Sequence, residues 1–173
     1  MISRREFIKA LVAGTVLLPL KKVYASRTDE RILSMHNIHT NEKLDIKYYS
    51  SGMYDGNALE TINHFLRCHY TNEVKEIDVK VIDLLCSVKN SVDKCKQIQI
   101  ISGYRSPAYN AFLVSLGRNV SPNSLHQQGV AIDFSIDGVN SNRLYGIAKS
   151  FEMGGVGKYP EFVHIDVGRI RYW

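Results

Sequence analysis

Two histidines and one aspartate in the last third of the chain have the residue types of a metal site. His126 and Asp133 lie in the stretch SLHQQGVAIDF (124–134), and His164 lies in a second apolar stretch, FVHIDV (162–167). A carboxylate within an apolar stretch needs a cation or a hydrogen-bond donor if it is buried. Two imidazoles and one carboxylate form a ligand set that suits catalytic zinc, with water as fourth ligand. The spacing alone also permits a solvent-facing aspartate and a structural histidine.

Alternation along two expected strands brings these side chains together. In the expected strands 130–136 and 162–167, apolar residues alternate with Asp133 and with His164. Successive side chains of a strand point to opposite faces. If the two strands pair, Asp133 and His164 meet on one polar face. His126, just before the first of these strands, can fold over the same place.

The elements that position these residues follow from apolar periodicity and turn residues. Period-2 alternation predicts a hairpin over 30–50, with a turn at 40–42, and a short strand over 97–104. Helices are predicted at 57–68, 78–95 with Asp78 as N-cap, 108–117 and 141–151, and a glycine-rich turn at 152–160. The chain of 173 residues therefore predicts a single α+β domain, with a small antiparallel sheet late in the chain and flanking helices.

The N-terminal segment has the order of a secretory signal. Basic residues precede an apolar run over 10–20, and the small residues of VYAS (23–26) permit cleavage after Ala25. The Arg4–Arg5 pair resembles a twin-arginine signal. An uncleaved anchor is the alternative, but the apolar run is short and contains Pro19. We expect a signal peptide at 1–25, the twin-arginine export machinery as a partner, and a periplasmic domain at 26–173 without a stable membrane span.

Net charge and cysteine content exclude some classes of function. The formal charge is +5, but outside residues 1–25 there are 17 basic and 16 acidic residues. This balance gives no basic patch that would indicate nucleic-acid binding. Three cysteines lack CxxC spacing, and Cys86 falls on an apolar helical stripe that predicts a buried thiol. The GGVG stretch (154–157) lacks the Lys-Ser/Thr of a phosphate-binding loop.

Three motifs in order resemble one family of peptidases. SLHQQGVAID fits Ser-x-His-x-x-Gly-x-Ala-x-Asp at every fixed position, and so resembles the zinc D-Ala-D-Ala peptidases and murein endopeptidases. SGYRSPAYN (102–110) and GGVGKYPEFVHIDVGRIRYW (154–173) most resemble the murein endopeptidase K branch. The resemblance covers about 31–173. It implies a hedgehog/DD-peptidase-like fold, a Zn²⁺ cofactor and a peptidoglycan substrate.

The resemblance also implies roles for individual residues. His126, Asp133 and His164 would bind zinc. Arg105, in SGYRS, matches an arginine that binds the scissile carbonyl or stabilises the developing oxyanion; its alternative is a salt bridge that supports the turn. Ser124 matches a serine that helps place the substrate, although a loop serine can equally cap a turn.

The general base is the open part of the resemblance. Glu161 stands three residues before His164, where many members carry an acid, and is the favoured catalytic base. Asp166 shares the face of His164 and could be the base or a partner that fixes the imidazole. An exposed Glu161 without a role is the third alternative. Gly129 and Ala131 are expected to permit close approach beside the site.

The residues and the resemblance together predict an exported zinc peptidase that hydrolyses peptide stems or crosslinks of peptidoglycan. Alternatives are a D-Ala-D-Ala carboxypeptidase or dipeptidase, a zinc-containing module that binds the cell wall without catalysis, and a structural envelope protein. Four other histidines, at 36, 39, 64 and 69, are interpreted as surface or core residues. Tyr172 and Trp173 either close the core or line the groove.

Overall fold

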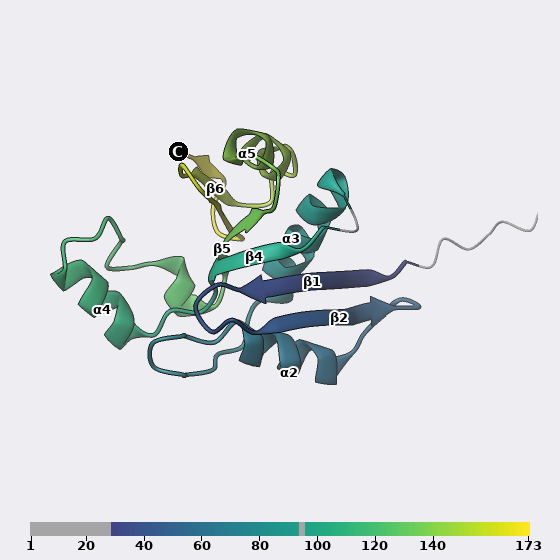
Figure 1. Cartoon of the computed structure of the whole chain (residues 1–173), viewed down its shortest axis with the longest axis horizontal. Helices are drawn as coiled ribbons and strands as arrows, with labels where there is room; N and C mark the ends of the chain where they lie inside the picture. The colour runs from purple at the N-terminus through teal and green to yellow at the C-terminus, as the bar shows by residue number, and fades with distance from the viewer. Residues whose placement is uncertain (1–28, 94–95) are drawn as a thin grey trace, which may run out of the picture.

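The computed structural model describes residues 29–93 and 96–173, where eight strands form one sheet in the order β3-β2-β1-β4-β5-β7-β6-β8 (Figure 1). The strands are β1 (Arg31–Asn37), β2 (Lys43–Ser50), β3 (Met53–Tyr54), β4 (Ile98–Ser102), β5 (Ala131–Ile136), β6 (Gly155–Lys158), β7 (Val163–Asp166) and β8 (Arg171–Tyr172). The helices are α2 (Gly56–Phe65), α3 (Val79–Val92), α4 (Pro107–Ser115), the 3₁₀ helix η1 (Leu125–Gln128) and α5 (Ser141–Ser150). The α+β class predicted from the sequence is confirmed.

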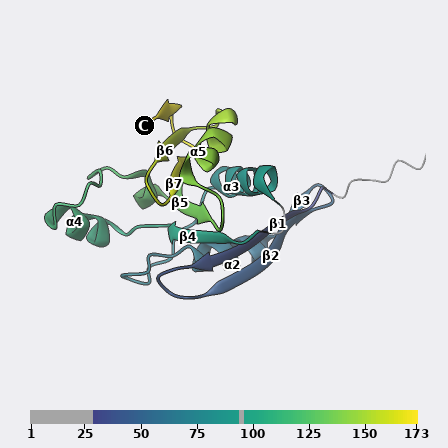
Figure 2. The same ribbon diagram turned by 45° about the horizontal axis from the view of Figure 1, so that its top comes forward.

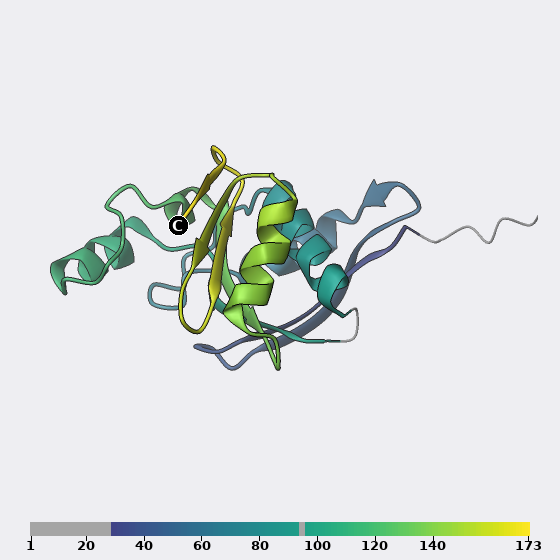
Figure 3. The ribbon, with the colours of Figure 1, turned by 90° about the horizontal axis from the view of Figure 1, so that it is seen from above.

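One face of the sheet carries the hydrophobic core. Helix α2 contacts β2, α3 contacts β1, β5 and β7, and α5 contacts β6 and β7. Figure 3 shows α3 and α5 beside each other along the central strands, while α4 stands apart from the sheet. Figure 2 shows that the strands turn steadily across the sheet, as twisted sheets do. The opposite face of β5 and β7 is therefore free of these three helices.

Capping and apolar spacing account for the early helices. The Asp78 side chain accepts a hydrogen bond from the Lys80 backbone N–H and begins α3, as predicted. The apolar stripe of α3 is buried. Helix α2 ends at Phe65, earlier than the predicted residue 68, because the backbone N–H of Cys68 donates to the carbonyl of Glu73 and not back along the helix to His64.

The sheet is larger and more mixed than the small antiparallel sheet that the sequence predicts. The hairpin β1–β2 is present as predicted. However, β4 pairs parallel to β1, so the hairpin and the late strands belong to one sheet. β8 also pairs parallel to β6. The first pairing joins segments far apart in the chain and the second skips over β7, and no local hairpin pattern encodes either partner.

The glycine-rich segment 152–160 is not simply a turn: it contains strand β6. The turn uses Glu152, whose φ is +53°. None of the glycines of β6 has a positive φ; their missing side chains permit close contacts. A Cβ at Gly155 would collide with the carboxylate of Asp166, and one at Gly157 would lie 2.5 Å from the Trp173 ring. The glycines serve close packing in a strand, which composition alone could not distinguish from turn chemistry.

Two cysteines lie in the described part of the chain. Cys86 is buried, as predicted, and Cys68 is buried too; both are free thiols. Cys95 and the predicted signal peptide lie outside the described residues. Within residues 29–93 and 96–173, no helix has the length and apolar character needed to cross a membrane.

Candidate metal centre

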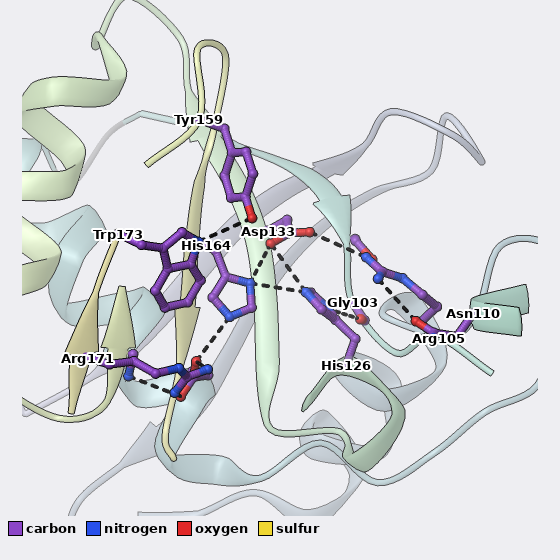
Figure 4. Close-up of polar contacts among 12 residues, drawn as sticks. Gly103, Arg105, Asn110, His126, Asp133, Tyr159, His164, Arg171 and Trp173 are labelled. Atoms are coloured by element: carbon purple, nitrogen blue, oxygen red, sulfur yellow. Dashed lines mark hydrogen bonds and ion pairs between the residues drawn. The ribbon is translucent and has the colours of Figure 1, made fainter. Parts of the chain in front are cut away.

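Asp133 and His164 face each other across two neighbouring strands. β5 and β7 pair antiparallel, with Asp133 directly opposite His164 (Figure 4). The His164 Nδ1 atom lies 2.8 Å from Oδ1 of Asp133. The alternate residues Ile132 and Val163 belong to the core. The predicted pairing and the shared polar face are therefore confirmed.

His126 reaches the same point from η1. Gly129 ends this short helix with φ of +74°, and a Cβ there would collide with the backbone carbonyl of Glu76. The Nδ1 of His126 lies 2.8 Å from the carbonyl oxygen of Gly103, which can only accept a hydrogen bond. Nδ1 therefore carries the proton, and Nε2 presents its lone pair toward Asp133 and His164, as a metal ligand does.

The three side chains have the geometry of a tetrahedral metal site. Nε2 of His126 lies 3.2 Å from Nδ1 of His164 and 3.3 Å from Oδ1 of Asp133. Zinc bonds of 2.0–2.1 Å imply tetrahedral ligand–ligand separations of about 3.3 Å. Two of the three separations match this value, and the third, from Nδ1 of His164 to Oδ1 of Asp133, is shorter at 2.8 Å. Within the described part of the chain, these three buried residues form a group that could hold a metal ion. The donor set and its spacing fit Zn²⁺.

The carboxylate of the cluster is held in its charged form. Burial alone would raise the pKa of Asp133, but the imidazoles of His126 and His164 lower this pKa well below its usual range. Asp133 is only 6% exposed, and the Arg105 guanidinium, 3.6 Å from Oδ2, compensates its charge in part. A divalent metal ion would complete this compensation.

Asp166 and Arg171 fix the second ring nitrogen of His164. The Nε2 atom of His164 lies 3.1 Å from Oδ2 of Asp166. The fully buried Asp166 also accepts hydrogen bonds from the backbone N–H groups of Gly155 and Gly168 and from both terminal nitrogens of Arg171. Its acceptor sites are thus occupied by donors. This geometry agrees with the alternative that Asp166 orients the imidazole, because a metal ligand of this kind is normally held by a carboxylate.

Arg105 approaches the cluster from the side opposite β7 (Figure 4). Its Nη2 lies 3.6 Å from Oδ2 of Asp133, and its backbone N–H donates to the carbonyl of His126. The guanidinium also contacts Ser102 and Asn110 at 3.4–3.5 Å. The buried Nε of Arg105 has no hydrogen-bond partner among the described residues. Arg105 also lines the cavity beside the cluster, where its positive charge can attract an oxygen of a ligand.

The cluster lies at a cavity of about 520 Å³. Arg105, Ser124 and residues 119–121 form part of its lining. Ser124 occupies the N-cap position of η1, but its side chain makes no capping hydrogen bond. Its predicted alternative as a turn cap therefore has no support in the structure, and its hydroxyl is available to a ligand.

Glu161 is not brought to the cluster. It is exposed, lies between β6 and β7, and does not line the cavity. Within the described residues, Asp133 is the sole carboxylate of the lining. The role of Glu161 as general base stays a prediction, and the geometry gives it no support.

Sequence reasoning missed part of the cavity wall. Tyr159, Phe162 and Arg171 line it, and so does Trp173, which the sequence left between core and groove. The β6–β7 hairpin places Tyr159 and Phe162. The pairing of β8 with β6 places Arg171 and Trp173, and no local signal in the sequence predicts that pairing.

Comparison with known proteins places the chain in a family. A family model described as peptidoglycan L,D-endopeptidase MepK matches residues 25–173. The chain belongs to the MepK family. Peptidoglycan L,D-endopeptidase MepK of Escherichia coli K12 is 36% identical over 99% of this chain and 97% of its own length. A probable MepK of Haemophilus influenzae is 34% identical over 99% of this chain and 95% of its own. No solved structure matches the chain significantly. The resemblance to the murein endopeptidase K branch is thereby confirmed.

Proposed function

We propose that this chain is a zinc-dependent peptidoglycan endopeptidase. The observation that carries the proposal is the His126–Asp133–His164 cluster, whose donor atoms have tetrahedral spacing beside a cavity. Membership of the MepK family supplies the substrate class, since its relatives are peptidoglycan L,D-endopeptidases by name. The cluster supports zinc, and the family supports the wall peptide as the molecule that is cut.

Zinc held by three protein ligands supplies Lewis acidity, which polarises a carbonyl. It also lowers the pKa of water, so that water can lose a proton and attack the carbonyl at neutral pH. His126 would contribute Nε2, His164 Nδ1 and Asp133 Oδ1. The Gly103 carbonyl and the Asp166 carboxylate hold the two imidazoles in these tautomers. The protein thus fixes the orientation of the ligands before the substrate arrives.

Arg105 binds the carbonyl oxygen of the scissile peptide. Its guanidinium belongs to a residue of the cavity lining, and its Nη2 lies 3.6 Å from Oδ2 of Asp133. A fixed positive charge stabilises the oxyanion that develops on that oxygen as water adds. Ser124, on the same wall, positions the substrate backbone through its free hydroxyl.

The descriptions of the relatives favour an endopeptidase over a carboxypeptidase or dipeptidase. A carboxypeptidase or dipeptidase acting on D-Ala-D-Ala shares the same predicted ligands, so the ligands alone do not separate the reactions. The relatives that match almost the whole chain are described as endopeptidases. A wall-binding module without catalysis would have no need of a guanidinium beside the metal ligands, where Nη2 of Arg105 lies 3.6 Å from Oδ2 of Asp133.

The substrate class requires a location outside the cytoplasmic membrane. We propose export by the twin-arginine route, on the basis of Arg4–Arg5 and the apolar run that follows. Fractionation of cells that carry the Arg4→Lys/Arg5→Lys double variant tests this. The protein should move from the periplasm to the cytoplasm, and unchanged export would contradict the route without affecting the enzyme.

Product identification tests the endopeptidase directly. Purified protein loaded with zinc is incubated with defined crosslinked muropeptides, and the products are identified by mass spectrometry. Cleavage within the crosslink is the expected result. Release of a terminal D-Ala alone would support the carboxypeptidase, and binding without any product would support the non-catalytic module.

A further inference from the structure

Trp173 is a half-exposed aromatic residue beside the metal ligands, with no role in the proposed chemistry. Its side chain lines the cavity, and 47% of its surface is exposed. Its ring centroid lies 5.4 Å from that of His164. We propose that Trp173 and Tyr159 form a binding surface for the peptide residue next to the scissile bond, on the side of the cluster away from Arg105.

Strand pairing and backbone hydrogen bonds position the indole of Trp173. β6, β7 and β5 place Gly157, His164 and Asp133 in one row across the sheet. Trp173 donates its backbone N–H to the Val156 carbonyl, and its own carbonyl accepts from the N–H of Lys158. The ring then lies over Gly157, where a Cβ would approach it to 2.5 Å. A side chain at position 157 would displace the indole from its place.

Polar contacts fix the orientation of the ring. The indole Nε1–H donates to the Tyr159 hydroxyl at 3.3 Å. The Arg171 guanidinium lies 5.0 Å from the ring centroid and is itself held by Asp166. Tyr159 stacks on Phe162 with centroids 4.4 Å apart. These contacts fix the ring although about half of its surface faces solvent, so packing in the core does not explain them. The ring is therefore preorganised to bind a ligand.

Distance identifies the part of the substrate that reaches this surface. One residue of an extended peptide spans about 3.3–3.6 Å. The separation of 5.4 Å between the Trp173 and His164 rings therefore places the indole within one or two residues of the reacting carbonyl. Figure 4 shows Trp173 and Arg105 on opposite sides of the ligands, so a bound peptide would pass between them.

Chemistry defines what the surface accepts. The faces of Trp and Tyr contact aliphatic C–H groups and peptide planes favourably. The nearby Arg171 charge is already neutralised by Asp166. We therefore assign this surface to the aliphatic part of a stem-peptide residue, an assignment that rests on the proposed function.

Steady-state kinetics with the zinc-loaded protein and a crosslinked muropeptide test the assignment. Trp173→Ala is expected to raise KM about tenfold while kcat stays within about threefold of the original value. Trp173→Phe should recover most of the affinity. Gly157→Ala, which displaces the indole without removing it, should also raise KM. Zinc content should be unchanged in all three variants.

Phe112→Ala is the matched control. Phe112 is 41% exposed, on α4 and outside the cavity, so its removal should leave KM unchanged. An unaltered KM in Trp173→Ala would overturn the inference. A loss of kcat and zinc without a change of KM would also overturn it, because Trp173 would then support His164 instead of the substrate.

Fluorescence gives a second, independent readout. Trp173 is the single tryptophan of the chain, so all indole emission reports this position. Titration of the isolated cleavage products into the zinc-loaded protein should shift the emission to the blue and protect it from acrylamide quenching. Unchanged emission at product concentrations that inhibit turnover would contradict the inference. If the protein cleaves no muropeptide at all, the proposed function fails; if it cleaves and all Trp173 variants match the original protein, only this inference fails.

Discussion

The two faces of strands β5 and β7 are both buried, yet they differ in kind. On one face Ile132, Phe134 and Val163 are fully covered by the core. On the other, Asp133 and His164 are 6% and 8% exposed, almost as little. Burial alone therefore does not distinguish the structural face from the functional one.

The difference lies in the partners. Apolar side chains on the core face contribute through area removed from water. The polar face concentrates charge: a carboxylate with a lowered pKa contacts two imidazoles and lies near a guanidinium. Such an arrangement is costly without a ligand to complete it, so it indicates function. Changes on one face should alter activity, and changes on the other should alter stability.

His126→Ala should have the largest effect on the functional face. Loss of one of three ligands is expected to remove zinc and lower the rate of muropeptide cleavage by about 10³-fold or more. Circular dichroism should still show the folded protein. His64→Ala, an exposed histidine outside the cluster, is the control and should keep both zinc and activity. Full cleavage by the His126 variant would remove the basis for the metal centre.

Arg105→Ala should come next. Removal of the charge that faces the developing oxyanion is expected to lower kcat by about 10²–10³-fold, with zinc content retained. Metal analysis beside the kinetics separates this effect from that of His126. A variant with normal kcat would indicate that Arg105 only supports the turn through a salt bridge.

Asp166→Asn should have a smaller effect on activity, because it acts by lowering the affinity for zinc. The amide keeps the size of the side chain but loses the charge that holds the His164 ring, so zinc affinity should fall about 10–100-fold. Competition with a chromogenic chelator measures this affinity. If zinc affinity is unchanged and only kcat falls, Asp166 acts as the base and not as a positioning residue.

Ile132→Val tests the structural face at a position adjacent to Asp133. Loss of one buried methylene from the core should lower the free energy of unfolding by about 0.5–1.5 kcal/mol. Denaturant titration measures this loss. Turnover per folded molecule should remain unchanged, and a marked fall would show that the two faces are not independent.

Glu161→Gln should have the smallest effect. The side chain is exposed and does not line the cavity, so kcat should stay within about threefold of the original value. The measurement is a pH–rate profile of both proteins. A large loss together with a missing acidic limb would restore Glu161 as the general base predicted from the resemblance.

Local sequence patterns predicted the metal site more accurately than they predicted the overall fold. Alternation in 130–136 and 162–167 was sufficient to bring Asp133 and His164 to one face, because strand parity is a local property. The strand character of Gly155–Lys158 was not predicted, because its glycines indicated a turn. The position of Trp173 was not predicted, because it depends on the pairing of β8 with β6 across the intervening β7. The same holds for the parallel pairing of β1 with β4.

The metal dependence of cleavage tests the central claim most directly. The protein is purified, its metal content is measured, and cleavage of a crosslinked muropeptide is followed before chelation, after chelation and after addition of zinc. We predict one zinc per chain, loss of cleavage with loss of zinc, and recovery when zinc returns. Undiminished cleavage by protein free of metal would contradict the assignment of His126, Asp133 and His164 as a catalytic zinc site.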